Sequence, residues 1–296
     1  MPDSPPALWV GGDLGLDVVV EPQGEVRWGD DAPASVSLLP GGQGANVAVW
    51  ARRAGAAVRL FTHLGDDALA RHLARAARRA GVAVRARHSG TSTRVVSLVE
   101  GQGARRTLFA HLGDGAWADL PARRPGGRLA LYVSGYALVR PGGRAWVEGA
   151  RVWARRHAVP VAVTPSAVSV LERAGLEAWA ALAQGAWAVV LNGAEATAVT
   201  GAADPAAACR RLARSHDIVL VTLGRAGARL GTGGRVIPVP AAALATAPRD
   251  TTGAGDAAAG TFLARLLLGD GPDEAAAAAM AAAALAISQP GAWPQA

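Results

Sequence analysis

Short apolar segments alternate with helical segments along most of this 296-residue chain, and this alternation constrains the fold more than any other feature. The segments are rich in Val and Leu and have few polar positions, which is typical of strands buried on both faces. Strands that alternate with helices predict an α/β fold with a doubly wound, mostly parallel sheet covered on both faces. The predicted strands include residues 8–10, 58–62, 82–87, 129–134, 159–164, 187–191 and 218–222.

Two segments, near residues 13–38 and 88–110, do not follow this rhythm. In the second, apolar stretches flank a Gly-Gln-Gly turn at 101–103, so residues 94–110 predict a hairpin. We expect the two segments to form a small β-sheet that acts as a lid. Without a linker or an internal repeat to divide it, the chain is predicted to be a single domain, residues 1–296.

The composition excludes several classes of protein. No apolar run reaches the length of a membrane span, no signal peptide is evident, and the single cysteine, Cys209, suits a reducing cytoplasm. The net charge is +7, and the chain carries arginine but no lysine. A chain without lysine cannot form a Walker-type P-loop. Its arginine pairs are scattered rather than clustered, so we expect no nucleic-acid partner.

The stretch from Asp250 to Asp256 carries the strongest chemical signal. Gly253, Ala254 and Gly255 allow a ligand to approach the backbone, and residues 256–268 predict a helix that starts directly after them. Free N–H groups at a helix start favour anions. Asp256 is either an ordinary N-cap or a base that takes a proton from a hydroxyl attacking a phosphate.

A second glycine-rich stretch, residues 41–46, precedes a predicted helix over 47–54 with Asn46 as its N-cap. Three glycines in four residues exceed the needs of a cap and indicate a backbone that lies against a small ligand. Asp13 and Asp17 lie near a predicted strand end, where they serve either a turn or a sugar ligand. Ligands of such sheets bind beyond the carboxyl ends of the strands, where Asn192, Glu195, Thr222 and Gly224 are also expected.

Together these stretches resemble the ribokinase/PfkB family of carbohydrate kinases, over almost the whole chain. Residues 41–48 resemble its N-terminal signature and residues 250–256 its C-terminal signature. The shorter motifs 65–67, 134–136, 192–195 and 222–227 follow in the family's order. The resemblance implies a Rossmann-like core and an ATP-dependent kinase that phosphorylates a primary hydroxyl of a small sugar or sugar-like acceptor. A nucleoside kinase and, less so, a sugar-phosphate kinase are the alternatives within the fold, and a binding protein that has lost turnover is another class.

The resemblance also implies a role for each position. Asp256 would be the general base, and the backbone of Gly253, Ala254 and Gly255 the anion hole. Glu195 would bind Mg²⁺ through water. Asp250 and Thr252 would bind a monovalent cation, K⁺, together with backbone from residues 287–292. The acceptor would lie against Asp13, Asp17, Gly41, Gly42, Gln43 and Asn46, and the nucleotide against Asn192, Thr222, Gly224 and Gly227. Family members are often dimers joined through the lid.

Some positions depart from the family pattern. Gln43 stands where the ribokinase form usually carries lysine, and Gly15 where it has an asparagine that contacts the sugar. Thr164 replaces an aspartate of many relatives, and Gln295 stands where a cation-binding serine is sometimes found. Arg94, Arg105 and Arg106 on the predicted hairpin either contact an anionic acceptor or are ordinary surface cations.

Overall fold

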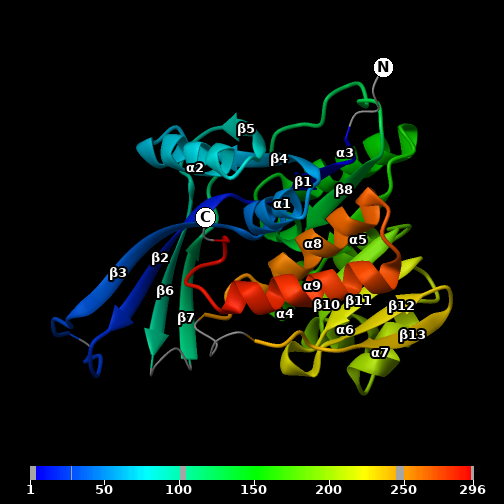
Figure 1. Ribbon diagram of the computed structural model, residues 1–296. Coiled ribbons are helices and arrows are strands. Elements are labelled where there is room, and N and C mark those ends of the chain that lie inside the picture. The colour runs from blue at the N-terminus through cyan, green and yellow to red at the C-terminus, as the bar shows by residue number, and fades with distance from the viewer. Residues whose placement is uncertain (1–4, 28, 101–104, 245–249, 295–296) are drawn as a thin grey trace.

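The computed structural model describes residues 5–27, 29–100, 105–244 and 250–294. Its largest element is a nine-stranded sheet with the strand order β13-β12-β11-β10-β9-β8-β1-β4-β5 (Figure 1). In this order, the seven strands from β11 across to β5 run parallel to one another, and β12 and β13 add an antiparallel edge. The strands are β1 (Ala7–Gly11), β4 (Ala57–Leu64), β5 (Ala83–His88), β8 (Leu129–Ser134), β9 (Val161–Thr164), β10 (Ala188–Asn192), β11 (Ile218–Thr222), β12 (Ala228–Thr232) and β13 (Arg235–Val239).

A second, four-stranded sheet projects from one end of the large one, with the order β3-β2-β6-β7 (Figure 1). It consists of β2 (Gly15–Pro22), β3 (Ala34–Gly41), β6 (Thr93–Glu100) and β7 (Arg105–His111). β6 and β7 pair antiparallel, which confirms the predicted hairpin. The predicted fold class, a doubly wound and mostly parallel sheet with a smaller sheet beside it, is therefore confirmed.

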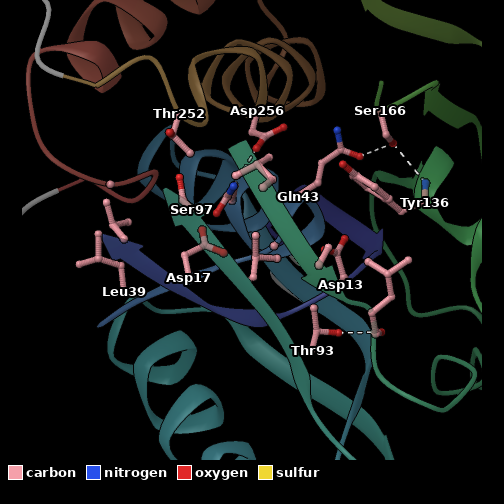
Figure 2. A pocket seen from close by; sticks show the side chains of 18 of the residues that line it. Asp13, Asp17, Leu39, Gln43, Thr93, Ser97, Tyr136, Ser166, Thr252 and Asp256 are labelled. Atoms are coloured by element: carbon pink, nitrogen blue, oxygen red, sulfur yellow. Dashed lines mark hydrogen bonds between the residues drawn. The ribbon is translucent and has the colours of Figure 1, made fainter. Parts of the chain in front are cut away.

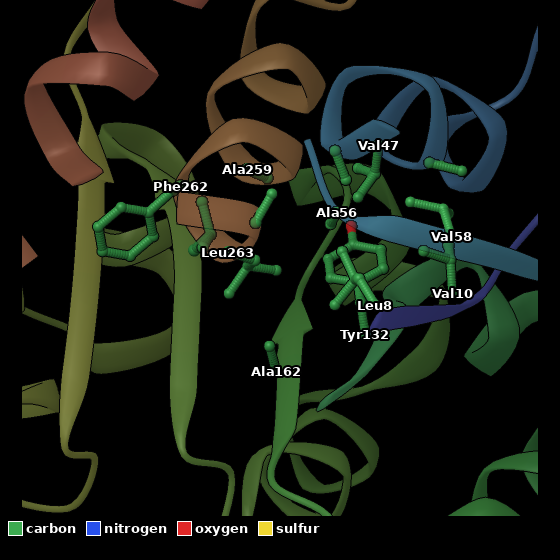
Figure 3. Close-up of a cluster of buried hydrophobic side chains, with 14 of the residues drawn as sticks. Leu8, Val10, Val47, Ala56, Val58, Tyr132, Ala162, Ala259, Phe262 and Leu263 are labelled. Atoms are coloured by element: carbon green, nitrogen blue, oxygen red, sulfur yellow. The ribbon is translucent and has the colours of Figure 1, made fainter. Parts of the chain in front are cut away.

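Successive strand residues point to opposite faces of the large sheet, so its apolar strands make both faces apolar. Helices cover both faces. In β1, Leu8 and Val10 pack under the first group of helices (Figure 3), whereas Trp9 packs under the second group. The first group is α1 (Gln43–Arg53), α2 (Ala68–Arg79), α8 (Ala254–Leu268) and α9 (Pro272–Ile287). The second is α3 (Gly143–Arg156), α4 (Val168–Ala174), α5 (Leu176–Ala183), α6 (Gly193–Thr200) and α7 (Pro205–Leu212). Two 3₁₀ turns, η1 (Gly135–Val139) and η2 (Gly224–Ala226), follow strand ends, and Cys209 is buried.

Two helix starts differ from the sequence prediction. α1 begins at Gln43 rather than Val47, with Gly42 as its N-cap at φ +95°, so Asn46 lies inside the helix and the N-cap prediction for it is wrong. The glycine provides a left-handed φ that lets the helix begin a turn earlier. α8 begins at Ala254 with Gly253 as its N-cap, so Asp256 lies in the first turn and is not the cap. This removes the ordinary structural explanation for Asp256.

Candidate active site

The site lies where the strand order of the large sheet changes direction. From β1 the chain continues through β4 to β5 on one side, and from β8 to β11 on the other. The carboxyl ends of β1 and β8 therefore diverge into a crevice, the usual ligand position in such sheets. The first turns of α1 and α8 also reach it. These helices pack closely, because Gly260 leaves no side chain against α1: an added Cβ there would lie 2.3 Å from the Val47 carbonyl oxygen.

A cavity of about 250 Å³ occupies the crevice between the large and small sheets (Figure 2). Its polar end carries the carboxylates Asp13, Asp17 and Asp256 and the amides Gln43 and Asn46. Its other wall comes from the small sheet and is mainly apolar, formed by Val19, Leu39, Val95, Leu108, Ala110 and Leu112.

A second, smaller cavity of about 120 Å³ lies on the other side of Asp256. Asn192, Glu195, Thr222 and Gly255 are among the residues that line it. Gln43, Ser166 and Asp256 line both cavities. Asp256 is therefore the one carboxylate at the junction between the two cavities, among the described residues.

The environment of Asp256 makes its carboxyl unusually basic. Its pKa is raised from 3.8 to about 7, first by burial and then by the negative charges of Asp13 and Glu195, while hydrogen bonds from Asn46 and Gln43 oppose the rise. A carboxylate with a pKa near neutral pH can take up a proton and release it under working conditions. Such a perturbed acid in a crevice is characteristic of a catalytic position.

Asn46 is engaged on both sides by protein groups. Its Nδ2 donates to Asp256 Oδ2 at 2.7 Å, and its Oδ1 accepts from Trp293 Nε1 at 2.9 Å. Asn46 lines the first cavity with only 5% of its surface exposed. It therefore orients Asp256, a contact that the sequence does not predict, in addition to bordering the expected acceptor site.

The glycines of residues 41–44 make room for the two aspartates near β1. A Cβ on Gly41 would lie 2.1 Å from an Asp17 carboxylate oxygen, and one on Gly42 would lie 2.8 Å from the Asp13 carbonyl oxygen. Gly44 N donates to Asp13 Oδ1 at 3.4 Å. Gly42 lines the first cavity, whereas Gly41 lies behind Asp17. The stretch is thus packed against Asp13 and Asp17, which themselves face the cavity.

Asn192 and Glu195 form a capping box at the start of α6. Glu195 Oε1 accepts from Asn192 Nδ2 at 2.8 Å and Oε2 accepts from Asn192 N at 2.9 Å, while Glu195 N donates to Asn192 Oδ1. Burial raises the pKa of Glu195, against the effect of the Asn192 hydrogen bond. The carboxylate is 4% exposed and pairs with no cationic side chain in the described ranges. A buried carboxylate facing a cavity fits a hydrated divalent cation.

The start of α8 consists of small residues, of which Gly255 lines the second cavity. Gly253 adopts φ +74°, and a Cβ on it would lie 2.6 Å from the Ala292 Cβ. A Cβ on Gly255 would meet nothing within 4 Å, so the space above this residue is open. Ala254 N lies 3.4 Å from the Thr251 carbonyl oxygen. The helix start thus leaves room for an anion over Gly255, beside Asp256.

Gly224 and Gly227 lie outside both cavities, unlike Thr222, which lines the second one. Gly227 has φ +78°, and a Cβ there would lie 2.1 Å from the Val239 carbonyl oxygen. The turn that joins β11 to β12 therefore requires a glycine at position 227 for structural reasons alone.

Asp250 and Thr252 form a compact polar turn at the rim of the first cavity. Asp250 Oδ1 accepts from Thr252 N at 2.8 Å and from Thr252 Oγ1 at 2.6 Å, and Oδ2 accepts from Gly291 N at 3.2 Å. Asp250 N donates to the Ile287 carbonyl oxygen. The structure thus brings together the carboxylate, the hydroxyl and the 287–292 backbone predicted for a cation site, while Gln295 lies outside the described residues.

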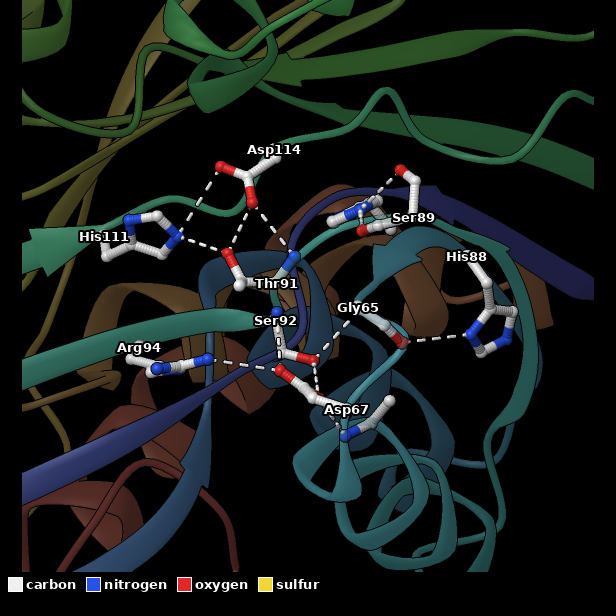
Figure 4. Close-up of polar contacts among 11 residues, drawn as sticks. Gly65, Asp67, His88, Ser89, Thr91, Ser92, Arg94, His111 and Asp114 are labelled. Atoms are coloured by element: carbon white, nitrogen blue, oxygen red, sulfur yellow. Dashed lines mark hydrogen bonds and ion pairs between the residues drawn. The ribbon is translucent and has the colours of Figure 1, made fainter.

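Asp67, in the motif of residues 65–67, anchors the base of the small sheet (Figure 4). Its side chain caps α2 through Ala70 N and accepts hydrogen bonds from Ser92 N, Ser92 Oγ and Arg94 Nη2. Although burial acts to raise it, these hydrogen bonds lower the pKa of Asp67 to about 2. Asp67 therefore ties α2 to the start of β6.

Some residues of the site were not identified from the sequence. Ser166 lines both cavities and has φ +79°, a strained value for a side chain other than glycine. Trp293 and the apolar wall of the small sheet are further examples. No local motif signals them, because each reaches the site only through tertiary packing.

Two cavities meet at one basic carboxylate beside a glycine-bearing helix start, an arrangement suited to the transfer of a phosphoryl group to a hydroxyl. A family model described as pfkB family carbohydrate kinase matches residues 17–295, and the chain belongs to this family. The protein is therefore an ATP-dependent phosphotransferase with an alcohol group as acceptor.

Solved structures of kinases share the fold over nearly the whole chain. Adenosine kinase from Sinorhizobium meliloti superposes with a TM-score of 0.84 at 22% identity, covering 99% of this chain and 96% of that one. Fructokinase from Vibrio cholerae gives 0.80 at 24% identity, with 98% and 95% covered. Aminoimidazole riboside kinase from Salmonella enterica gives 0.77 at 28% identity, with 97% and 95% covered. No curated protein sequence matches significantly.

None of the helices in the described ranges is both long and apolar enough to cross a membrane.

Proposed function

We propose that the protein transfers the γ-phosphoryl group of ATP to a primary hydroxyl of a small sugar or sugar-like acceptor, with Asp256 as the general base. The observation that carries this proposal is the position of Asp256 between two cavities, with a pKa of about 7. The acceptor hydroxyl gives its proton to Asp256 as its oxygen bonds to the γ-phosphorus, and the bond from phosphorus to the ADP oxygen breaks. The backbone N–H groups of Gly253, Ala254 and Gly255 stabilise the negative charge of the transferred phosphoryl group.

We assign the acceptor to the first cavity. Asp13 and Asp17 offer carboxylate oxygens for sugar hydroxyls, and Gly41, Gly42, Gln43 and Asn46 shape the same end. Asp13, Asp17, Asp250 and Asp256 line this cavity and no arginine does, among the described residues, which disfavours a sugar phosphate. Arg94 instead pairs with Asp67. The side chains of Arg105 and Arg106 lie outside the described residues.

A nucleoside is the second candidate acceptor, and the apolar wall of the small sheet favours it. Val19, Val95, Leu108 and Leu112 present a surface on which a base could pack while its ribose reaches Asp17 and Asp256. A free pentose or hexose would leave this wall without an apolar partner. An acceptor panel must therefore include nucleosides as well as sugars.

We assign ATP to the second cavity and its continuation past Asn192, Thr222, Gly224 and Gly227. Glu195 would hold Mg²⁺ through water, and the metal would neutralise charge on the phosphates. Asp250 and Thr252, with the 287–292 backbone, would hold a monovalent cation such as K⁺ beside the anion hole. The capping box supports the first assignment by fixing the Glu195 carboxylate toward the cavity, and the Asp250 turn supports the second.

We also propose that the whole chain acts as one domain, with the small sheet as a lid over the acceptor, and that two copies join through this sheet. Val36, Leu38 and Phe109 on the small sheet are between 54% and 63% exposed, a cluster that a partner copy would bury. The use of ATP and the single buried cysteine suit a cytoplasmic protein.

The test is ADP release from Mg·ATP across pentoses, hexoses, ketose phosphates and nucleosides, with and without K⁺. Asp256→Asn serves as the blank and Asp217→Asn, at the opposite end of the sheet, as the matched control. We expect one acceptor class to give turnover that Asp256→Asn lowers by about 10²–10⁴-fold, with ATP binding retained. Full turnover in Asp256→Asn would show that Asp256 is not the general base.

A further inference from the structure

The carboxamide of Gln43 is fixed at one end by two serine hydroxyls, of which Figure 2 shows that of Ser166. Its Oε1 accepts from Ser134 Oγ at 2.6 Å and from Ser166 Oγ at 2.5 Å. Tyr136 N lies within hydrogen-bonding distance of both hydroxyl oxygens, at 3.3 Å and 3.2 Å. Each hydroxyl has one proton to donate, and its oxygen already faces an N–H donor. The two hydroxyl oxygens also lie 3.3 Å from each other. With both hydroxyls donating to Oε1, the carbonyl oxygen of Gln43 lies at the serine end and its NH₂ group at the opposite end.

The opposite end of the carboxamide faces the proposed base. Gln43 hydrogen-bonds Asp256, and both residues line the two cavities. An ionised carboxylate can only accept hydrogen bonds, so the favourable group facing it is the NH₂ of Gln43. A reversed carboxamide would place its oxygen against the carboxylate and would favour the protonated acid.

We propose that Gln43 is a positioning residue for Asp256, and that Ser134 and Ser166 keep its NH₂ group directed at the carboxylate. This inference rests on the proposed function only in giving Asp256 a catalytic role. The φ of +79° at Ser166 supports it, since a strained backbone at a non-glycine residue is retained where its side chain is needed.

The charged and titratable groups that act most strongly on Asp256 are acidic. They are Asp13 after β1, Glu195 on α6, Tyr132 on β8 and Tyr136 on η1, while Asp17 on β2 and Asp250 line the same cavity. The amides of Asn46 and Gln43 are the neutral donors that oppose them. Loss of either amide should therefore move the titration of Asp256 toward higher pH.

The experiment is an infrared titration of the protonated carboxyl band that Asp256→Asn abolishes, recorded without substrate. Gln43→Met removes the amide and keeps the volume. Ser166→Gly removes one hydroxyl and tolerates the positive φ, and Ser215→Ala is a matched control remote from the site. Thermal melting of each variant checks the fold. In parallel, the pH dependence of kcat/KM is measured for any acceptor found.

We expect the midpoint to rise by about one pH unit in Gln43→Met and by about half a unit in Ser166→Gly, with no change in Ser215→Ala. The acidic limb of kcat/KM should move by the same amounts. An unchanged midpoint in both folded variants overturns the inference, even if turnover is normal. A shifted midpoint in a protein that phosphorylates nothing would support the positioning role and count against the proposed function.

Discussion

Replacement of Asp256 by Asn is expected to stabilise the protein at pH 8, and this gain should shrink as the pH falls. The folded-state pKa of Asp256 is raised from 3.8 to about 7, first by burial and then by Asp13 and Glu195. A carboxyl with a raised pKa binds its proton more tightly in the folded chain than in the unfolded one. The free energy of unfolding therefore falls as the pH rises from 3.8 to 7.

The size of the effect follows from the two pKa values. With a pKa difference of about 3 units, ionisation of Asp256 lowers the free energy of unfolding by about 4 kcal/mol above pH 7. At pH 5, where only the unfolded carboxyl is ionised, it lowers this free energy by about 1.6 kcal/mol. The Asn variant has no such dependence. Because Asp256 borders an open cavity, solvent screening reduces these values. We expect the stability gap between variant and wild type to widen by about 1–2.5 kcal/mol between pH 5 and pH 8.

The assay is urea unfolding of wild type and Asp256→Asn at pH 5, 6, 7 and 8. Asp217→Asn, an exposed aspartate at the far end of the sheet, is the matched control and should show no such trend. Comparing the change of the gap with pH cancels any packing difference between the two side chains. A gap that stays constant from pH 5 to pH 8 would refute the raised pKa and, with it, the argument for a poised base.

Three further variants test the neighbours of Asp256. Asn46→Ala removes the 2.7 Å bond to the carboxylate, so kcat/KM for the acceptor should fall about tenfold at pH 7 and recover toward pH 9, with little change in the KM for ATP; an equal loss at both pH values would contradict this. Gly255→Ala should leave the melting temperature unchanged or slightly raised, because the added methyl meets nothing within 4 Å. Its turnover should nevertheless fall at least tenfold, since the methyl enters the space assigned to the phosphoryl group. In steady-state assays Asp250→Asn should abolish the stimulation by K⁺ expected of the wild type, and a stimulation that survives would move the cation elsewhere.

Local patterns in the sequence were sufficient to locate the parts of the site that depend on neighbouring residues. The three-residue spacing of Asn192 and Glu195 is that of a capping box, and the structure contains one. The small residues at 253–255 marked the start of α8 to within two positions. The strand and helix periods fixed the fold class, because a strand buried on both faces leaves a continuous apolar run.

Local sequence patterns could not predict the contacts that orient Asp256 and shift its pKa. Asn46 and Asp256 are 210 residues apart, and Trp293 and Asn46 are 247 residues apart. They meet because Gly260 allows α8 to pack against α1 and because the last described residues return to the site. Nothing near Ser166 in the sequence indicates a left-handed backbone at a serine. The start of α1 was misplaced because Asn46 resembles a cap, whereas the φ of Gly42 already permits the helix to begin.

The acidity of the site connects its two cavities. Glu195 faces the smaller cavity, yet its charge is one of the causes that raise the pKa of Asp256. Neutralising that charge with a cation would lower the pKa of Asp256 and favour the ionised form that accepts a proton. In the proposed mechanism the base is partly protonated before the donor binds, since its pKa of about 7 lies near neutral pH. Binding of a cation and donor beside Glu195 would then prepare the proposed base for the acceptor.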